Sequence, residues 1–254
     1  MRSSRGFTLI ELLLVVGLLG VLAAMLLPMA TKARHASWRA VSAHSLRQLA
    51  SCGTNYLSDH DGEFWKYKET SHEGTTWWFG FESSLSPNFG EGDRILDLTR
   101  GPLGPYAIAT SGVKSDPAFM EFSARHKPKF RNGNYGYGYN AHLGGGAMGR
   151  LVRPRIVSFR RPGDVVMFAT CAQVNTFQPP ADPKNPMIEE FYLVDSNNTT
   201  VHFRYNGKAL AVMLDGSLRE LPMHPGTLDK RMPTAQIGRF APVGNATYMV
   251  DPAD

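Results

Sequence analysis

One carboxylate interrupts the longest apolar run of the sequence. Glu11 lies between Phe7 and Leu27, a stretch in which Thr8 is the other polar residue. Inside a bilayer a charged carboxylate costs about 2.5–3.5 kcal/mol, so its presence indicates a function and a partner. The stretch itself supplies no Lys, Arg or His. Glu11 is therefore either protonated or paired with a cation from another chain.

No familiar catalytic motif accompanies this carboxylate. The sequence lacks His-Glu-x-x-His, Gly-x-Ser-x-Gly, a P-loop and Cys-x-x-Cys. Gly136 and Gly138 have no third glycine to complete a dinucleotide loop, and none of the eight histidines pairs with another at helical ligand spacing on an apolar face. We therefore expect no catalytic residues, no cofactor and no metal site, and a chain that is not an enzyme.

Two weaker signals for ligands can be weighed from the residues. Asp59 and Asp61 precede Gly62 as in a calcium loop, but the further early ligand and the distal Glu of such a loop are missing. Five arginines, at positions 150, 153, 155, 160 and 161, form a patch that could contact DNA. Aromatic side chains for base stacking are not interleaved with them, so we favour a solvated strand edge and do not expect a nucleic acid partner.

Composition limits the remaining classes of protein. The 254 residues are 43% hydrophobic and 19% charged, with 25 Gly and 17 Pro, which excludes collagen-like, coiled-coil and disordered chains. The net charge of +5 is too mild to imply nucleic acid by itself. Two cysteines, Cys52 and Cys171, exclude a disulfide scaffold. A bridge between them is conceivable in an oxidising compartment, but we favour independent burial of both thiols.

The apolar stretch has the length of a membrane-spanning helix. Its 21 residues would extend roughly 31 Å as a helix, the thickness of the hydrocarbon core. A secretory signal peptide is the alternative, but its apolar region is about 7–15 residues long and a small-residue cleavage site should follow, which is not evident before Pro28. We predict that residues 7–27 cross a membrane, and this single run excludes a polytopic membrane protein.

The residues from Arg5 to Leu13, Arg-Gly-Phe-Thr-Leu-Ile-Glu-Leu-Leu, resemble the class III leader junction of type IV prepilins and type II secretion pseudopilins. The resemblance implies that a membrane-embedded prepilin peptidase cleaves between Gly6 and Phe7 and N-methylates the new amine of Phe7. It also implies that Glu11 pairs with the N-terminal amine of a neighbouring subunit in a filament. It places the leader in the cytoplasm and exports the rest, which the basic residues on both sides of the span do not decide.

An amphipathic helix is predicted after the span. From position 29 to about 59 the chain has no proline and a single glycine. Small and apolar residues recur there at three- and four-residue spacing, which is typical of a helix with one packed face. These residues are Ala36, Ala40, Ala43, Leu46, Ala50, Gly53 and Leu57. We expect residues 28–59 to continue the membrane helix, with Pro28 as a kink and not a stop.

Beyond Gly62 the sequence predicts a β-rich head, because short apolar runs alternate with Gly, Pro, Asn and Asp. Residues 77–79 and 135–139 read as strands with aromatic faces, and residues 165–169 as a buried strand. Residues 178–187 hold four prolines and read as an exposed loop. The last thirty-odd residues, rich in proline, are expected to be irregular.

The clearest β unit lies near the C-terminus. The alternating run from Val201 to Tyr205 and the stretches 210–214 and 217–221 are separated by Asn206-Gly207 and Asp215-Gly216. Such dipeptides are strong hairpin signals, so we predict a three-stranded meander with two-residue turns. The alternation directs Tyr205 to the packed face and His202 to the solvent.

The C-terminal part loosely resembles a large-headed group of pseudopilin-like proteins that carries a signature of His, nine residues and Asp-Gly. Here Tyr205 occupies the place of the His, ahead of Asp215 and Gly216. Asp116 occupies a place where that group usually has a cysteine. If that cysteine normally forms a bridge, this chain lacks the bridge.

These features together predict a pilin-like α+β fold, in which a long N-terminal helix packs on a mainly antiparallel β-sheet head. Residues 1–6 form the leader, 7–27 the transmembrane helix, 28–59 its amphipathic extension, and 60–254 the head with an irregular tail.

The resemblance implies a structural subunit of a type II secretion pseudopilus or a related type IV pilus-like filament, held in a bacterial inner membrane with its head exported into the periplasm or an envelope filament. The implied partners are the prepilin peptidase, other pilin or pseudopilin subunits, an inner-membrane assembly platform and the lipid bilayer. The alternative is a monomeric, membrane-anchored exported protein whose head binds an extracellular ligand or DNA.

Overall fold

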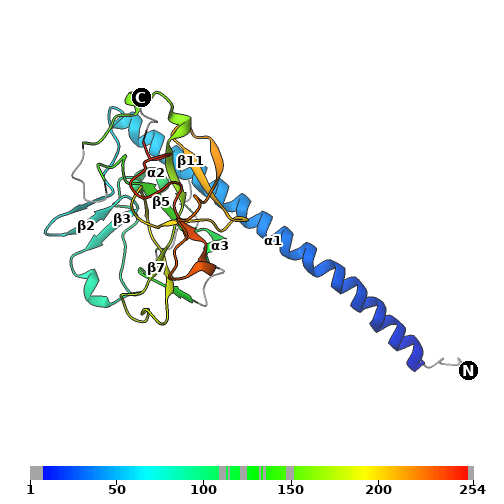
Figure 1. Cartoon of the computed structure of the whole chain (residues 1–254). Coiled ribbons are helices and arrows are strands. Elements are labelled where there is room, and N and C mark those ends of the chain that lie inside the picture. The colour runs from blue at the N-terminus through cyan, green and yellow to red at the C-terminus, as the bar shows by residue number, and fades with distance from the viewer. Residues whose placement is uncertain are drawn as a thin grey trace, which may run out of the picture.

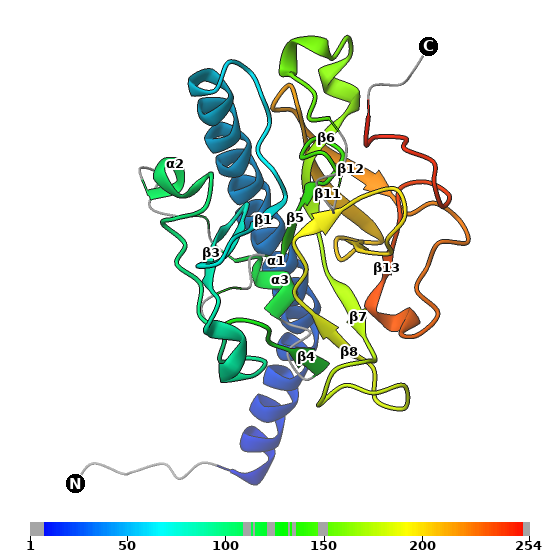
Figure 2. The same cartoon turned by 90° about the vertical axis from the view of Figure 1, so that its left-hand side faces the viewer.

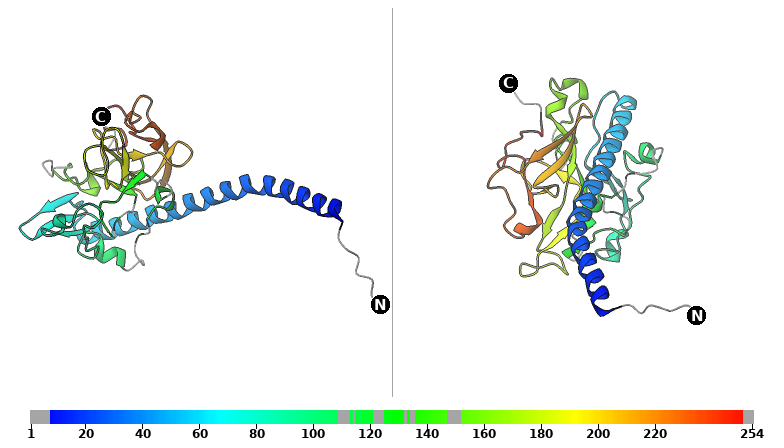
Figure 3. Two further views of the ribbon diagram at one scale, coloured as in Figure 1. Left: turned by 90° about the horizontal axis from the view of Figure 1, so that it is seen from below. Right: turned by 90° about the vertical axis from the view of Figure 1, so that its right-hand side faces the viewer.

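A single helix, α1 (Leu9–Asp59), dominates the molecule (Figure 1). The structure is a computed structural model that describes residues 8–108, 113, 115–120, 125–131, 133, 136–146 and 152–250. The 51 residues of α1 correspond to a length of about 77 Å. The helix continues through Pro28, as predicted, and Figure 3 shows it as a gently curved rod whose first half projects from the head.

The second half of α1 packs against a five-stranded sheet. Only the pair β5–β9 is parallel among the described strands of this sheet, and the other neighbours are antiparallel. The predicted α+β architecture with a mainly antiparallel head is therefore confirmed. In spatial order the strands are β12 (Leu218–Pro222), β11 (Lys208–Met213), β6 (Val166–Thr170), β5 (Tyr137–Asn140) and β9 (Leu193–Val194).

Smaller sheets and short helices surround this central sheet. An antiparallel sheet contains β1 (Lys68–Thr70), β2 (Gly74–Trp77) and β3 (Gly80–Ser83). Another sheet is mixed and has the order β4 (His126–Lys127), β8 (Met187–Glu189) and β7 (Gln173–Asn175), in which β4 and β8 are parallel. The strand β10 (Val201–His202) pairs with β13 (Ile237–Gly238). The helical turns are η1 (Ser86–Phe89), α2 (Gly104–Ile108), α3 (Pro117–Met120), η3 (Ile156–Ser158), η4 (Pro162–Asp164) and η5 (Pro233–Ala235).

The central sheet is covered on both faces, which explains its continuous apolar strands (Figure 2). Along β11, Leu210 and Val212 point into the core that α1 covers, whereas Ala211 and Met213 point into a second core. The C-terminal segment closes that second core with Phe240 and Met249 among others. The strand expected at residues 165–169 is therefore confirmed as buried, and the proline-rich C-terminal segment is irregular but packed.

The packed face of α1 begins later than its small-residue pattern suggests. Ala43, Ala50 and Gly53 are buried against the head, but Ala36 and Ala40 are exposed. At Gly53 a Cβ would lie 2.8 Å from a ring carbon of Trp65, so the close approach of helix and head requires glycine there. The small side chains thus let the helix lie directly on a layer of aromatic rings.

Two of the predicted strands are wrong in part. Trp77 ends β2, but Trp78 and Phe79 form the turn of the β2–β3 hairpin and are buried. The three-stranded meander is also wrong: β11 and β12 form a hairpin, while the other neighbour of β11 is β6. Residues 201–205 contact β11 only through the isolated bridge between Tyr205 and Lys208, on either side of the Asn206-Gly207 turn. The strand β10, which begins this run, pairs with β13 and not with β11.

The prediction that His202 faces solvent is wrong. His202 is fully buried: β10 pairs side by side with β13, and the His202 ring stands 6.2 Å from that of Phe119. Burial lowers the pKa of His202 well below its ordinary value, and Arg204 lowers it further. An alternating pattern predicts one solvent face only when nothing covers that face, and here the C-terminal segment does.

The turn at Asp215-Gly216 differs from the prediction in length. Gly216 N–H donates to Met213 O, and Met213 N–H donates to Ser217 O, so the hydrogen-bonded pair of Met213 and Ser217 encloses a loop of three residues. Gly216 has φ +80°, whereas Asp215 is not among the residues with positive φ. This arrangement is the three-residue hairpin loop with a glycine in the left-handed region.

A buried polar junction joins α1 to the head. The Tyr205 hydroxyl lies 2.6 Å from Ser42 Oγ on α1 and donates to Asp116 Oδ1 at 2.8 Å. Arg204 Nη1 stands 3.6 Å from the other oxygen of Asp116, and neither of these two side chains has exposed area. Burial raises the pKa of Tyr205 and keeps it a hydrogen-bond donor. The prediction that Tyr205 points to the packed face is confirmed.

We predict that Gly216→Val destabilises the protein by about 1–3 kcal/mol, the cost of an imposed backbone outlier. No atom lies within 4 Å of a Cβ at this position, so the loss would come from the backbone alone. Gly216→Asn, which tolerates positive φ, is the matched control and should lose clearly less. Denaturant unfolding of the full chain in detergent measures both, and equal losses would contradict the φ argument.

We predict that Tyr205→Phe costs about 1–3 kcal/mol of unfolding free energy, because Ser42 and Asp116 then lose a buried hydrogen-bond partner. Tyr106→Phe is the control, since the Tyr106 hydroxyl bonds to Asp59 at the exposed surface, and its loss should stay within about 0.5 kcal/mol. The same unfolding measurement compares the two. A smaller effect at Tyr205 than at Tyr106 would show that the junction does not hold the helix to the head.

Candidate functional site

The first turn of α1 positions Glu11, the residue that the sequence singled out. Thr8 is the N-cap, and its hydroxyl accepts the Glu11 backbone N–H. In return, the Thr8 backbone N–H and hydroxyl donate to Glu11 Oε2 at 2.9 and 2.8 Å. The other carboxylate oxygen, Oε1, has no hydrogen-bond partner among the described residues. The carboxylate is thus oriented by its own helix and keeps one oxygen open.

Sequence reasoning missed this role of Thr8. The signal was present, because Thr8-Leu9-Ile10-Glu11 is the Thr-x-x-Glu pattern of a capping box. The box satisfies the N-terminal N–H of Thr8 and that of Glu11, which would otherwise be unpaired in an apolar medium. Glu11 therefore finds a partner within its own chain as well as the one expected from a second chain.

The helix that carries Glu11 offers an apolar surface without a partner in this chain. Every residue from Thr8 to Ser37 is exposed, including Leu9, at 76% exposed, and Leu27, at 67%. α1 is long and apolar enough to cross a membrane, and the part that qualifies has no buried residue. At Gly17 and Gly20 a Cβ would meet no atom within 4 Å, so these positions leave room for another helix to approach closely.

The other sequence-predicted site residues do not gather near Glu11. Gly6 and Phe7 lie outside the described residues. Tyr205 precedes β11, whereas Asp215 and Gly216 follow it, so the whole strand separates the parts of the C-terminal signature. The Ser217 side chain, together with the Ser217 N–H that donates to Asp215 Oδ1 at 2.8 Å, holds the pKa of Asp215 below its ordinary value. Asp215 therefore shapes the turn, and Tyr205 belongs to the buried junction.

The arginine cluster is used in part to hold the end of α1. Arg153 pairs with Glu63 and donates to Phe64 O at 2.8 Å. Arg155 donates to the Asp61 carbonyl, and its backbone pairs with that of Glu63. Arg150, a further member of the cluster, lies outside the described residues. The contacts of Arg153 and Arg155 therefore have a structural role at the end of α1.

Both cysteines and one lysine of the chain are buried. Cys52 and Cys171 are both free and buried, so independent burial is confirmed, and desolvation raises the pKa of Cys171 to about 12. The buried Lys127 ammonium contacts Glu91 at 2.8 Å and Glu189 at 3.4 Å. In the described part of the chain, no three His, Cys, Asp or Glu side chains are placed to hold a metal ion.

Comparison with known proteins gives a match for the N-terminal residues alone. No curated protein and no solved structure matches the chain. Residues 1–27, which include Gly6, Phe7 and Glu11, match a family described as the prokaryotic N-terminal methylation motif. The motif implies processing by a prepilin peptidase, and the chain therefore begins with a class III leader of the type IV prepilin kind.

Proposed function

We propose that the chain is a structural subunit of a type II secretion pseudopilus or a related type IV pilus-like filament, and that it acts by assembly and not by catalysis. The observation that carries this proposal is the exposed apolar first half of α1 directly behind a methylation motif. A helix that is apolar on every face must be buried in lipid or against other helices. A filament core of bundled helices offers the second environment once the subunit leaves the first.

The same proposal places the parts of the chain relative to the membrane. Residues 1–6 lie in the cytoplasm, residues 7–27 span the inner membrane, and the head is exported into the periplasm or an envelope filament. The prepilin peptidase removes the leader at the cytoplasmic surface, and an inner-membrane platform then assembles the subunit with its neighbours. No catalytic step in the head is part of this cycle.

The geometry around Glu11 supports a role in register. Thr8 holds Oε2 and so fixes the direction of the carboxylate, while Oε1 remains open toward the outside of the helix. The amine of a neighbouring chain's Phe7 could donate to Oε1 without disturbing the cap. In an apolar filament core such a charge pair is favoured over two separate charges, so it would fix the axial offset between subunits.

The alternative is a monomeric, membrane-anchored binding protein. It would have the same leader and anchor but would never leave the membrane. Isolation of sheared filaments separates the two functions, because the monomeric protein stays in the membrane fraction. No contact in the described part of the head specifically favours this alternative.

We predict that the mature chain begins at Phe7 and carries an N-methyl group, because Gly6-Phe7 lies at the edge of the apolar span where the peptidase acts. Intact-protein mass spectrometry of the chain from membranes measures both changes. A mature chain that begins after Ala24 or near Ala30 would indicate an ordinary signal peptide and would contradict the proposed function.

We predict that Glu11→Gln and Glu11→Val are inserted and processed normally. The amount of either variant found in filaments should be at least about tenfold lower than that of the unsubstituted chain, a factor that corresponds to about 1.4 kcal/mol. Gln at this position preserves the capping box and removes the charge, whereas Val removes both. Ile10→Val is the matched control and should assemble normally. Quantitative blotting of sheared filaments measures the effect, and normal assembly of Glu11→Gln would show that the charge pair is not required.

A further inference from the structure

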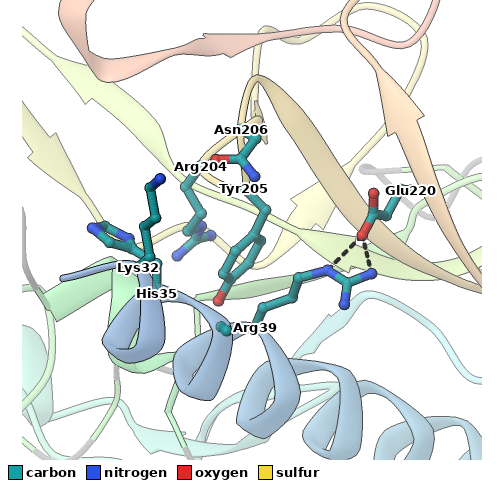
Figure 4. A pocket seen from close by; sticks show the side chains of 8 residues that line it. Lys32, His35, Arg39, Arg204, Tyr205, Asn206 and Glu220 are labelled. Atoms are coloured by element: carbon teal, nitrogen blue, oxygen red, sulfur yellow. Dashed lines mark hydrogen bonds and ion pairs between the residues drawn. The ribbon is translucent and has the colours of Figure 1, made fainter. Parts of the chain in front are cut away.

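A cavity of about 670 Å³ lies between α1 and the head, where the helix leaves the head (Figure 4). Lys32, His35 and Arg39 line it from α1, and Arg204 and Asn206 line it from the loop before β11. Figure 4 shows Arg204, Tyr205 and Asn206 above the helix, and Arg39 reaching from α1 to Glu220. With Glu220 of β12, three separate segments of the chain line the cavity, and three of the five side chains named above carry a permanent positive charge.

The negative charge in the wall is already compensated. Glu220 is the one carboxylate that lines the cavity among the described residues. It forms an ion pair with Arg39 and lies 3.8 Å from Lys208 Nζ. Lys32, in contrast, has no ion-pair partner in the described part of the chain. The cavity therefore keeps an excess of positive charge that an anion would neutralise.

The buried side chain of Arg204 has acceptors for only part of its N–H groups, and its charge partner is Asp116, whose Oδ2 lies 3.6 Å from Nη1. Its Nη2 donates to Gly136 O at 2.8 Å and to Cys171 O at 3.0 Å. Its Nε and Nη1 have no hydrogen-bond acceptor among the described residues, and the side chain has no exposed area. Buried N–H groups without acceptors are uncommon and costly. Because its side chain has no exposed area, Arg204 lies behind the surface of the cavity and contributes positive charge to the wall without touching the contents.

The position of the cavity along α1 indicates the source of the anion. Lys32 is the first charged residue after the apolar stretch and follows Leu27 by five positions, a rise of about 7.5 Å. The headgroup layer on each side of a bilayer extends about 5–8 Å beyond the hydrocarbon core. A lysine at this depth can extend its ammonium toward the headgroups. Trp38, which stacks edge-on with His35 at 5.1 Å, is of the residue type enriched at this interface.

We propose that this cavity binds the phosphate group of an anionic phospholipid from the membrane that α1 crosses. Lys32 and His35 contact the phosphate from the helix, Asn206 lines the opposite wall in the loop before β11, and the small side chain of Ala36 leaves room for the phosphate. The bound headgroup fixes the height and tilt of the head above the bilayer before assembly. The proposal rests on the transmembrane placement of residues 7–27 given above, and not on filament formation.

Native mass spectrometry of the full chain tests this proposal. The protein is purified in a zwitterionic detergent and offered equimolar phosphatidylglycerol and phosphatidylcholine, and the ratio of the two adducts is measured. We expect phosphatidylglycerol to be preferred about fivefold or more, the factor that one cation contributes at an anionic headgroup. Lys32→Gln should lower that ratio about fivefold. Arg34→Gln is the matched control, because Arg34 lies on the same turn but does not line the cavity and stacks on Trp38 at 4.8 Å.

A steric pair of variants tests the cavity without changing any charge. Ala36→Phe fills the space and should abolish the phosphatidylglycerol preference. Ala33→Phe adds the same ring one turn away, at an exposed position that does not line the cavity, and should preserve it. Unchanged unfolding curves for both variants show that the fold is intact.

Several outcomes would overturn the proposal. Equal binding of the two lipids would exclude an anion site, and equal losses in Lys32→Gln and Arg34→Gln would indicate diffuse attraction to the surface. Displacement of phosphatidylglycerol by an equal concentration of inorganic phosphate would assign the cavity to a free anion. Dimers that disappear in Lys32→Gln, without any lipid preference, would assign it to a carboxylate of a second copy. Because the monomer is scored in detergent, these results are independent of whether filaments form.

Discussion

The structure depends on one constraint: a single continuous helix has an apolar first half that the described part of the chain leaves uncovered and a second half that is packed under the head. Up to Ser37 the helix exposes apolar side chains on every side, and from Ser42 onward it buries one face under a folded head. Backbone hydrogen bonds within the helix make the first half tolerable in lipid, since no N–H or C=O group there needs water. The second half is held by tertiary packing. The head is therefore built around the end of a rod that is anchored elsewhere.

The junction of Ser42, Tyr205 and Asp116 connects α1 to the head. Its hydroxyl and carboxylate groups fix where along α1 the head sits, because a shift of one residue would separate Tyr205 from Ser42. The two positions at which the chain departs from the C-terminal resemblance, Tyr205 and Asp116, contact each other directly. A tyrosine–aspartate hydrogen bond thus occupies the region where the resemblance would place a histidine and a cysteine. The same junction brings Arg204 close to the helix and forms one wall of the basic cavity.

The chemistry of this protein is concentrated at the membrane end of α1. In the head, charged side chains such as Lys127 form ion pairs, here with Glu91 and Glu189. At the first turn of α1, by contrast, Glu11 keeps one open oxygen on an exposed surface. A protein organised in this way presents its unsatisfied groups to lipid and to other helices. This distribution is what an assembling subunit requires, and it is consistent with the methylation motif at residues 1–27.

The sequence by itself determined the features that follow from local pattern: the long helix, its continuation through Pro28, the buried strand β6, the positive φ of Gly216 and the burial of Tyr205. Even the cap on Glu11 could have been read from the Thr8-x-x-Glu11 spacing. Only the tertiary structure decided the partner of β10, the burial of His202 and the basic cavity. The physical reason is that period and turn chemistry fix one residue relative to its near neighbours, whereas these features arise where segments far apart in the chain cover each other. His202 alternates correctly with Tyr205, but the segment that buries it begins about thirty residues later, at a distance over which no local pattern carries information.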